Sequence, residues 1–141
     1  MHYALKTDAF AKLAAKADIP DAALRKAVAE MRDGLIDANL GGNIYKKRVA
    51  VGNKGKSGGS RTIIATNLHD RWFFLYCFLK KDQENISAKE EMAFRFTAKT
   101  LLSLTEAQID AAIAAGEMEK PVHPAAQTKD PAFIPMDAYS L

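Results

Sequence analysis

Three consecutive stretches between residues 44 and 80 read as β-strands joined by short links, and they constrain the fold more than any other part of the chain. They run over residues 44–50, 61–66 and 71–80, and β-branched residues dominate the second stretch. Neighbouring strands with short links pair antiparallel, so the sequence predicts an antiparallel meander. The third stretch is apolar on both faces, which predicts a central, covered strand.

Helical periodicity precedes the predicted sheet. Residues 7–17 place apolar side chains such as Phe10 and Leu13 on one face at helical spacing. Pro20 is tolerated in a first helical turn, and Gly34 suits the position just past a helix end. The sequence therefore predicts a helical hairpin before the strands.

Two further helices are indicated after the strands. Residues 87–90 and 105–108 both have the capping-box pattern that begins a helix, and Gly116 ends the second one. The region beyond is rich in proline and has no clear period. We therefore expect an α+β fold in one domain over residues 1–117, followed by an extended tail over residues 118–141.

Charge is distributed unevenly along the chain. The net charge is +3, yet there is no Asp or Glu between Asp37 and Asp70. Six cations in that interval give it a local charge of +6 and leave −3 for the remainder. A stretch of one sign on an otherwise acidic molecule indicates a polyanionic partner.

The predicted strands can gather these cations on one face. Side chains alternate along a strand, so Lys46 and Arg48 point to the same side. Such a face can hold RNA phosphates and stabilise the charge of a phosphorane during metal-independent cleavage. The candidate catalytic residues are Lys46, Arg48, Arg61 and Lys80, and the candidate RNA-binding residues are Lys47, Lys54, Lys56, Lys81 and Tyr76, with a core role as the alternative for Tyr76.

Other catalytic constellations are weak or absent in the sequence. Cys77 lies in an apolar run, which favours a buried structural thiol. The histidines His2, His69 and His123 are interpreted as surface residues, and we expect neither a metal site nor a cofactor. Because every apolar run is well short of about 18 residues and the N-terminus lacks a secretion signal, we expect a cytoplasmic protein without a membrane span.

The basic and glycine-rich segments together resemble a known family. Residues 40–42, 46–50, 52 and 54–62, followed by the aromatic residues 73–76, Lys80 and residues 85–87, are similar to the HigB-like branch of the RelE/ParE toxin superfamily. The resemblance covers about residues 8–116. It implies a compact fold in which a helical hairpin and C-terminal helices pack on an antiparallel sheet.

The resemblance also implies a function. It indicates the toxin of a type II toxin–antitoxin pair, which cuts mRNA on the ribosome and is neutralised by a bound antitoxin protein. The cationic face itself predicts that an acidic or amphipathic segment of the antitoxin masks it, and we expect oligomers to form through the antitoxin. Position by position, it implies that Lys46, Arg48, Arg61 and Lys80 form the site, although no tyrosine follows Lys80 closely as in some relatives. The alternative is a non-catalytic inhibitor of the same fold, either a ParE-like gyrase poison or a degenerate binding protein.

Overall fold

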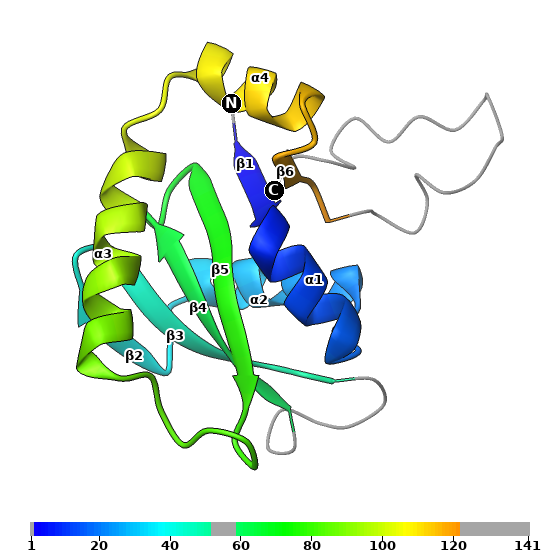
Figure 1. Cartoon of the computed structure of the whole chain (residues 1–141), viewed down its shortest axis with the longest axis vertical. Helices are drawn as coiled ribbons and strands as arrows, with labels where there is room; N and C mark the ends of the chain where they lie inside the picture. Colours follow the sequence, from blue (N-terminus) through cyan, green and yellow to red (C-terminus); the bar gives the residue numbers. More distant parts are fainter. Residues whose placement is uncertain (1, 52–58, 122–141) are drawn as a thin grey trace, which may run out of the picture.

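The computed structural model describes residues 2–51 and 59–121. These residues form one mixed sheet with helices on both of its faces (Figure 1). The strands are β1 (Tyr3–Thr7), β2 (Ala38–Gly41), β3 (Ile44–Val49), β4 (Ser60–Thr66), β5 (Arg71–Leu79) and β6 (Met118–Glu119), and the helices are α1 (Asp8–Lys16), α2 (Asp21–Arg32), α3 (Ala88–Leu102) and α4 (Glu106–Ala114).

The predicted meander is confirmed. Strands β3, β4 and β5 are neighbours and pair antiparallel, and their ends lie within one residue of the predicted ones. The order of the sheet is β2-β3-β4-β5-β1-β6, so β5 is interior and its Trp72, Phe73 and Phe74 are fully buried. Strand β1 pairs parallel with β5, which the sequence did not predict.

Helices α1 and α2 cover one face of the sheet, as the predicted hairpin requires. Helix α1 begins where the hydroxyl of Thr7 accepts a hydrogen bond from the N–H of Phe10. The ring of Phe10 lies 5.4 Å from that of Phe74 in β5. Burial of these rings and of Leu24 and Val28 from α2 forms the core on this face.

Helices α3 and α4 lie on the opposite face, and both predicted capping boxes are present. Ser87 and Glu90 cap α3, whereas Thr105 and Gln108 cap α4. The boxes satisfy backbone N–H groups that the first helical turn leaves without partners. Ala98 and Ile109 are buried against Ile63 and Phe73 of the sheet, and a second core results.

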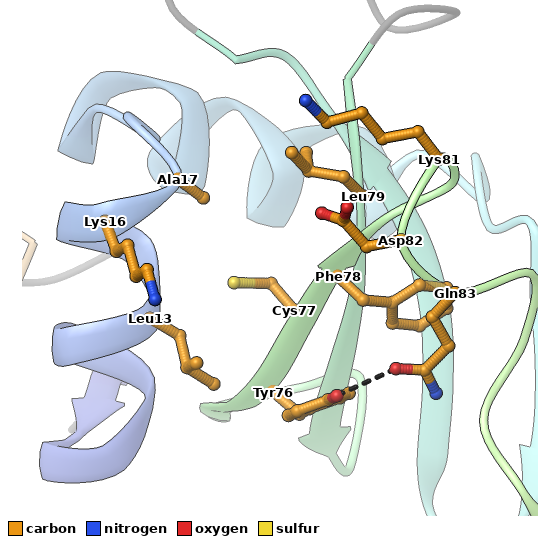
Figure 2. A pocket seen from close by; sticks show the side chains of 10 residues that line it. All are labelled: Leu13, Lys16, Ala17, Tyr76, Cys77, Phe78, Leu79, Lys81, Asp82 and Gln83. Carbon is orange, nitrogen blue, oxygen red and sulfur yellow. Dashed lines mark hydrogen bonds between the residues drawn. The ribbon is translucent and has the colours of Figure 1, made fainter.

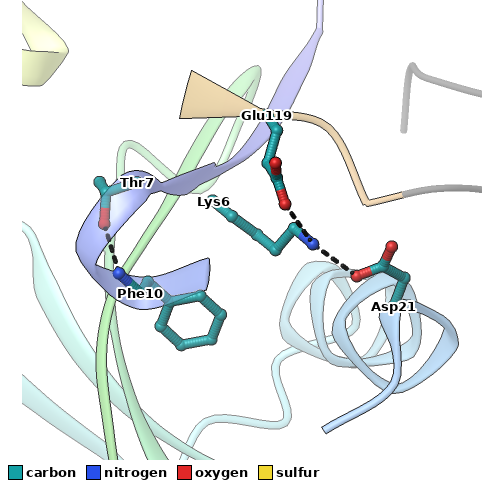
Figure 3. A network of polar contacts seen from close by, with 5 residues as sticks. All are labelled: Lys6, Thr7, Phe10, Asp21 and Glu119. Carbon is teal, nitrogen blue, oxygen red and sulfur yellow. Dashed lines mark hydrogen bonds and ion pairs between the residues drawn. The ribbon is translucent and has the colours of Figure 1, made fainter. Parts of the chain in front are cut away.

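A partly buried lysine, Lys6, joins β6 to the N-terminal elements (Figure 3). The Nζ atom of Lys6 lies 2.9 Å from a carboxylate oxygen of Asp21 in α2 and 2.9 Å from one of Glu119 in β6. Burial lowers the pKa of Lys6, but hydrogen bonds to these two carboxylates outweigh it, so the pKa is raised. Residues 118–119 thus belong to the sheet, and the predicted tail from residue 122 lies outside the described residues.

No helix within the described parts of the chain combines the length and apolarity that crossing a membrane requires.

Candidate functional site

The strand register places three of the predicted cations on one face of the sheet. Arg48 of β3 lies directly opposite Arg61 of β4, and Lys46 lies opposite Ile63, two residues further along β4. Residues directly opposite each other project from the same face of a sheet. Because Ile63 belongs to the core beneath α3, Lys46, Arg48 and Arg61 all project on the α3 side, and we call these three residues the basic face.

A close backbone approach allows this register. A Cβ atom on Gly59 would lie 2.1 Å from the carbonyl oxygen of Val49, so only glycine fits there. Directly after Gly59, Ser60 pairs with Val49 and Arg61 pairs with Arg48. The glycine before β4 therefore lets the two arginines face each other.

One hydrogen-bond donor of Arg61 has no partner within the described structure. Its Nη1 atom is buried and has no hydrogen-bond partner among the described residues. A buried donor without a partner costs free energy, and the cost is larger on a charged group. Arg61 as a whole is only partly buried, so an anion that binds its guanidinium would compensate this charge, and Arg61 stays a candidate for contacting a phosphate.

Arg48 is held by Asp37, a residue that the sequence reasoning did not include. Its Nε atom lies 2.9 Å from Oδ1 of Asp37, and its backbone N–H donates to Oδ2 at 2.6 Å. Burial raises the pKa of Asp37, but these hydrogen bonds and the charge of Arg48 lower it below its ordinary value of 3.8. The Asp37–Arg48 interaction therefore stabilises the folded state at pH values above 3.8, and this stabilisation is lost as the pH falls through the lowered pKa of Asp37.

Replacing Asp37 with asparagine is expected to strengthen binding of single-stranded RNA, because Asp37 no longer competes with a phosphate for the guanidinium of Arg48. A phosphate contact that is no longer shared with Asp37 should steepen the dependence of log K on log salt by up to about 0.7. Fluorescence anisotropy at several salt concentrations measures this slope. Asp33→Asn removes the same charge at the exposed end of α2, and equal slopes for the two variants would exclude Arg48 from RNA contact.

Tyr76 is brought to the same side as the basic face by an irregularity in β5. Ile63 pairs with Tyr76 while Ile64 pairs with Phe74, so Leu75 is an extra residue in β5. The phenol of Tyr76 donates to Oε1 of Gln83 at 2.9 Å, as Figure 2 shows. Burial, followed by the charge of Glu90, raises the pKa of Tyr76, so the phenol stays protonated at neutral pH.

An aromatic cluster surrounds Tyr76. Its ring centroid lies 5.4 Å from that of Phe94 in α3 and 6.0 Å from that of Phe78 in β5. Tyr76 is partly buried, so it contributes to the core and also keeps some exposed surface. Gln83, which fixes the phenol and also donates to Glu90, was missed because a glutamine in a loop carries no sequence signal.

Lys47 is not part of the basic face. It projects to the α2 side, is 3% exposed, and its Nζ atom lies 3.2 Å from Oε1 of Glu30. Alternation along β3 requires this placement, because Lys46 and Arg48 on either side of it face α3. A buried, ion-paired lysine cannot reach RNA without losing its partner, so we remove Lys47 from the proposed RNA-binding residues.

The remaining predicted cations lie at or beyond the end of the strands. Lys80 is exposed in the turn just after β5. Lys81 lines a pocket of about 370 Å³ between α1 and the end of β5, together with Lys16 (Figure 2). Lys54 and Lys56 lie outside the described residues.

The other candidate groups do not form a catalytic centre in the described structure. Cys77 is buried, and burial raises the pKa of its thiol to about 11, so it carries no thiolate at neutral pH. His2 and His69 are exposed and contact each other edge to face, whereas His123 lies outside the described residues. Within residues 2–51 and 59–121, no group of His, Cys, Asp or Glu is arranged to hold a metal ion.

Comparison with known proteins agrees with this architecture. A search of the curated proteins found no match. A family model described as the RelE toxin of the RelE/RelB toxin–antitoxin system matches residues 3–120, from the start of β1 to just beyond β6. The match names RelE and does not distinguish the HigB-like branch. Because it spans the whole described fold, the chain belongs to the RelE toxin family, the toxins of toxin–antitoxin pairs.

Proposed function

We propose that this toxin is an endoribonuclease that cuts mRNA on the ribosome, with the scissile phosphate bound at the basic face. The observation that carries the proposal is the buried Nη1 atom of Arg61, which has no hydrogen-bond partner among the described residues. Arg61 also lies directly opposite Arg48. A pair of arginines on a sheet face offers charge-assisted, planar hydrogen bonds that suit phosphate oxygens.

The proposed reaction uses the ribose as its own nucleophile. The 2′-hydroxyl gives its proton to solvent water and forms a bond to the adjacent phosphorus, the bond from phosphorus to the 5′-oxygen breaks, and that oxygen takes a proton from solvent water. The products are a 2′,3′-cyclic phosphate and a 5′-hydroxyl. Arg61 and Lys46 stabilise the phosphorane charge, whereas Arg48 and Lys80 hold the neighbouring backbone.

Mapping mRNA ends in cells after brief expression of the toxin tests this proposal. Primer extension should detect new ends within translated codons, and these ends should carry a 5′-hydroxyl. A reporter without its start codon is the matched control, and it should stay intact because no ribosome occupies it. Growth arrest without new mRNA ends would instead favour a non-catalytic inhibitor.

A further inference from the structure

The outer face of α3 carries two large apolar side chains in solvent. Met92 is 70% exposed and Phe96 is 74% exposed. They are four residues apart, so they are neighbours on the helix surface. Figure 1 shows α3 along one side of the fold, with its buried side against the sheet. Single exposed apolar residues are ordinary, but an adjacent pair on a regular helix is typical of a docking surface.

The polar groups next to this pair are already satisfied by α3 itself. The hydroxyl of Thr100 donates to the carbonyl oxygen of Phe96 at 3.2 Å, and the hydroxyl of Ser103 donates to that of Lys99 at 2.7 Å. Hydroxyls bonded to their own helix need no partner from another molecule. Covering this face therefore costs little desolvation of polar groups.

Positive charge lies at both ends of the apolar pair. Lys89 and Lys99 are exposed and form no ion pair within the described parts of the chain. The acidic residues of α3 are engaged elsewhere, since Glu91 pairs with Arg95 and Glu90 closes the capping box. The outer face of α3 is therefore apolar in the middle and basic at its ends.

A groove runs beside this face. A cavity of about 470 Å³ lies between α3 and the turn that joins β2 to β3, and Lys99, Arg95, Gly42 and Asn43 line it. Arg95 spans it, since Nη2 donates to the carbonyl oxygen of Leu40 at 2.9 Å. A helix lying along α3 can insert side chains into this groove, and acidic side chains would meet Lys99 there.

We propose that the antitoxin docks on the outer face of α3 through an amphipathic helix whose apolar stripe is bordered by acidic residues. Family membership supplies the partner, and the paired apolar side chains favour protein over RNA, because phosphates need only the cations. Helix α3 packs on the sheet side that bears the basic face. The docked segment therefore stands beside the RNA site, and this inference does not depend on mRNA cleavage.

Affinity measurements with the cognate antitoxin, defined as the protein whose co-expression restores growth, test the proposal. The double variant Met92→Ala/Phe96→Ala should raise the Kd of the full-length toxin by about tenfold or more. Leu35→Ala is the matched control, because Leu35 is 55% exposed but lies outside α3, and its Kd should stay within about twofold.

A second set of variants tests the two lysines beside the apolar pair. Lys89→Glu/Lys99→Glu reverses both charges, and Lys26→Glu on α2 is the control. The first variant should weaken binding and flatten its salt dependence, whereas the control should do neither. Expressed alone, the α3 variants should still arrest growth, since they lie off the basic face. An unchanged Kd, a loss of toxicity through weaker ribosome binding, or loss of a toxin dimer measured by light scattering would each overturn the proposal. If the toxin does not cleave mRNA, the expected changes in Kd for the antitoxin stay the same.

Discussion

Replacing Arg61 with alanine is expected to lower mRNA cleavage by about 10²- to 10³-fold and to abolish growth arrest. The guanidinium projects from the basic face opposite Arg48, and its buried Nη1 atom has no partner among the described residues. This Nη1 atom therefore contributes no hydrogen bond to the fold within the described residues. Removing the guanidinium should take away transition-state stabilisation, and the free energy of unfolding should fall by no more than about 0.5 kcal/mol.

Two variants make this result interpretable. Arg61→Lys keeps the charge but loses the planar pair of donors, so it should recover only part of the activity. Arg25→Ala makes the same truncation on α2, which packs on the opposite face of the sheet, and should stay toxic. Cleavage is measured by primer extension, and folding by circular dichroism in urea. If Arg61→Ala cleaves mRNA as fast as the wild type, Arg61 has no role in the reaction.

Truncating Phe74 to alanine is expected to lower the free energy of unfolding by about 3–5 kcal/mol. Phe74 is 0% exposed and belongs to the core beneath α1 and α2, where its ring lies 5.4 Å from that of Phe10. Its loss leaves a cavity where β5, β1 and α1 meet, since Lys6 of β1 pairs with Phe74. Domains of this size are stable by about 5–15 kcal/mol, so this is a large fraction of the total.

Phe96→Ala is the matched control, because the same atoms are removed from a side chain that is 74% exposed. Its free energy of unfolding should change by no more than about 0.5 kcal/mol. Urea denaturation followed by circular dichroism measures both variants. An equal loss in the two would mean that Phe96 is covered in solution, which would also contradict a free docking face on α3.

Much of the fold was predictable because it is encoded locally. The two capping boxes depend on residues three apart, and the central meander depends on strand composition and short links. Strands β1, β2 and β6 escaped prediction because they have five, four and two residues. Such short stretches become strands only when a neighbouring strand supplies hydrogen-bond partners.

For the candidate site, the sequence alone determined that Lys46 and Arg48 share a side, since alternation along one strand needs no other information. The sequence also showed the interval without Asp or Glu between Asp37 and Asp70, and the resemblance to the toxin family. Only the tertiary structure decided that Arg61 joins them and that Tyr76 turns toward them. A strand's register and the extra residue Leu75 depend on pairing between distant segments, and a shift of one residue moves a side chain to the other face.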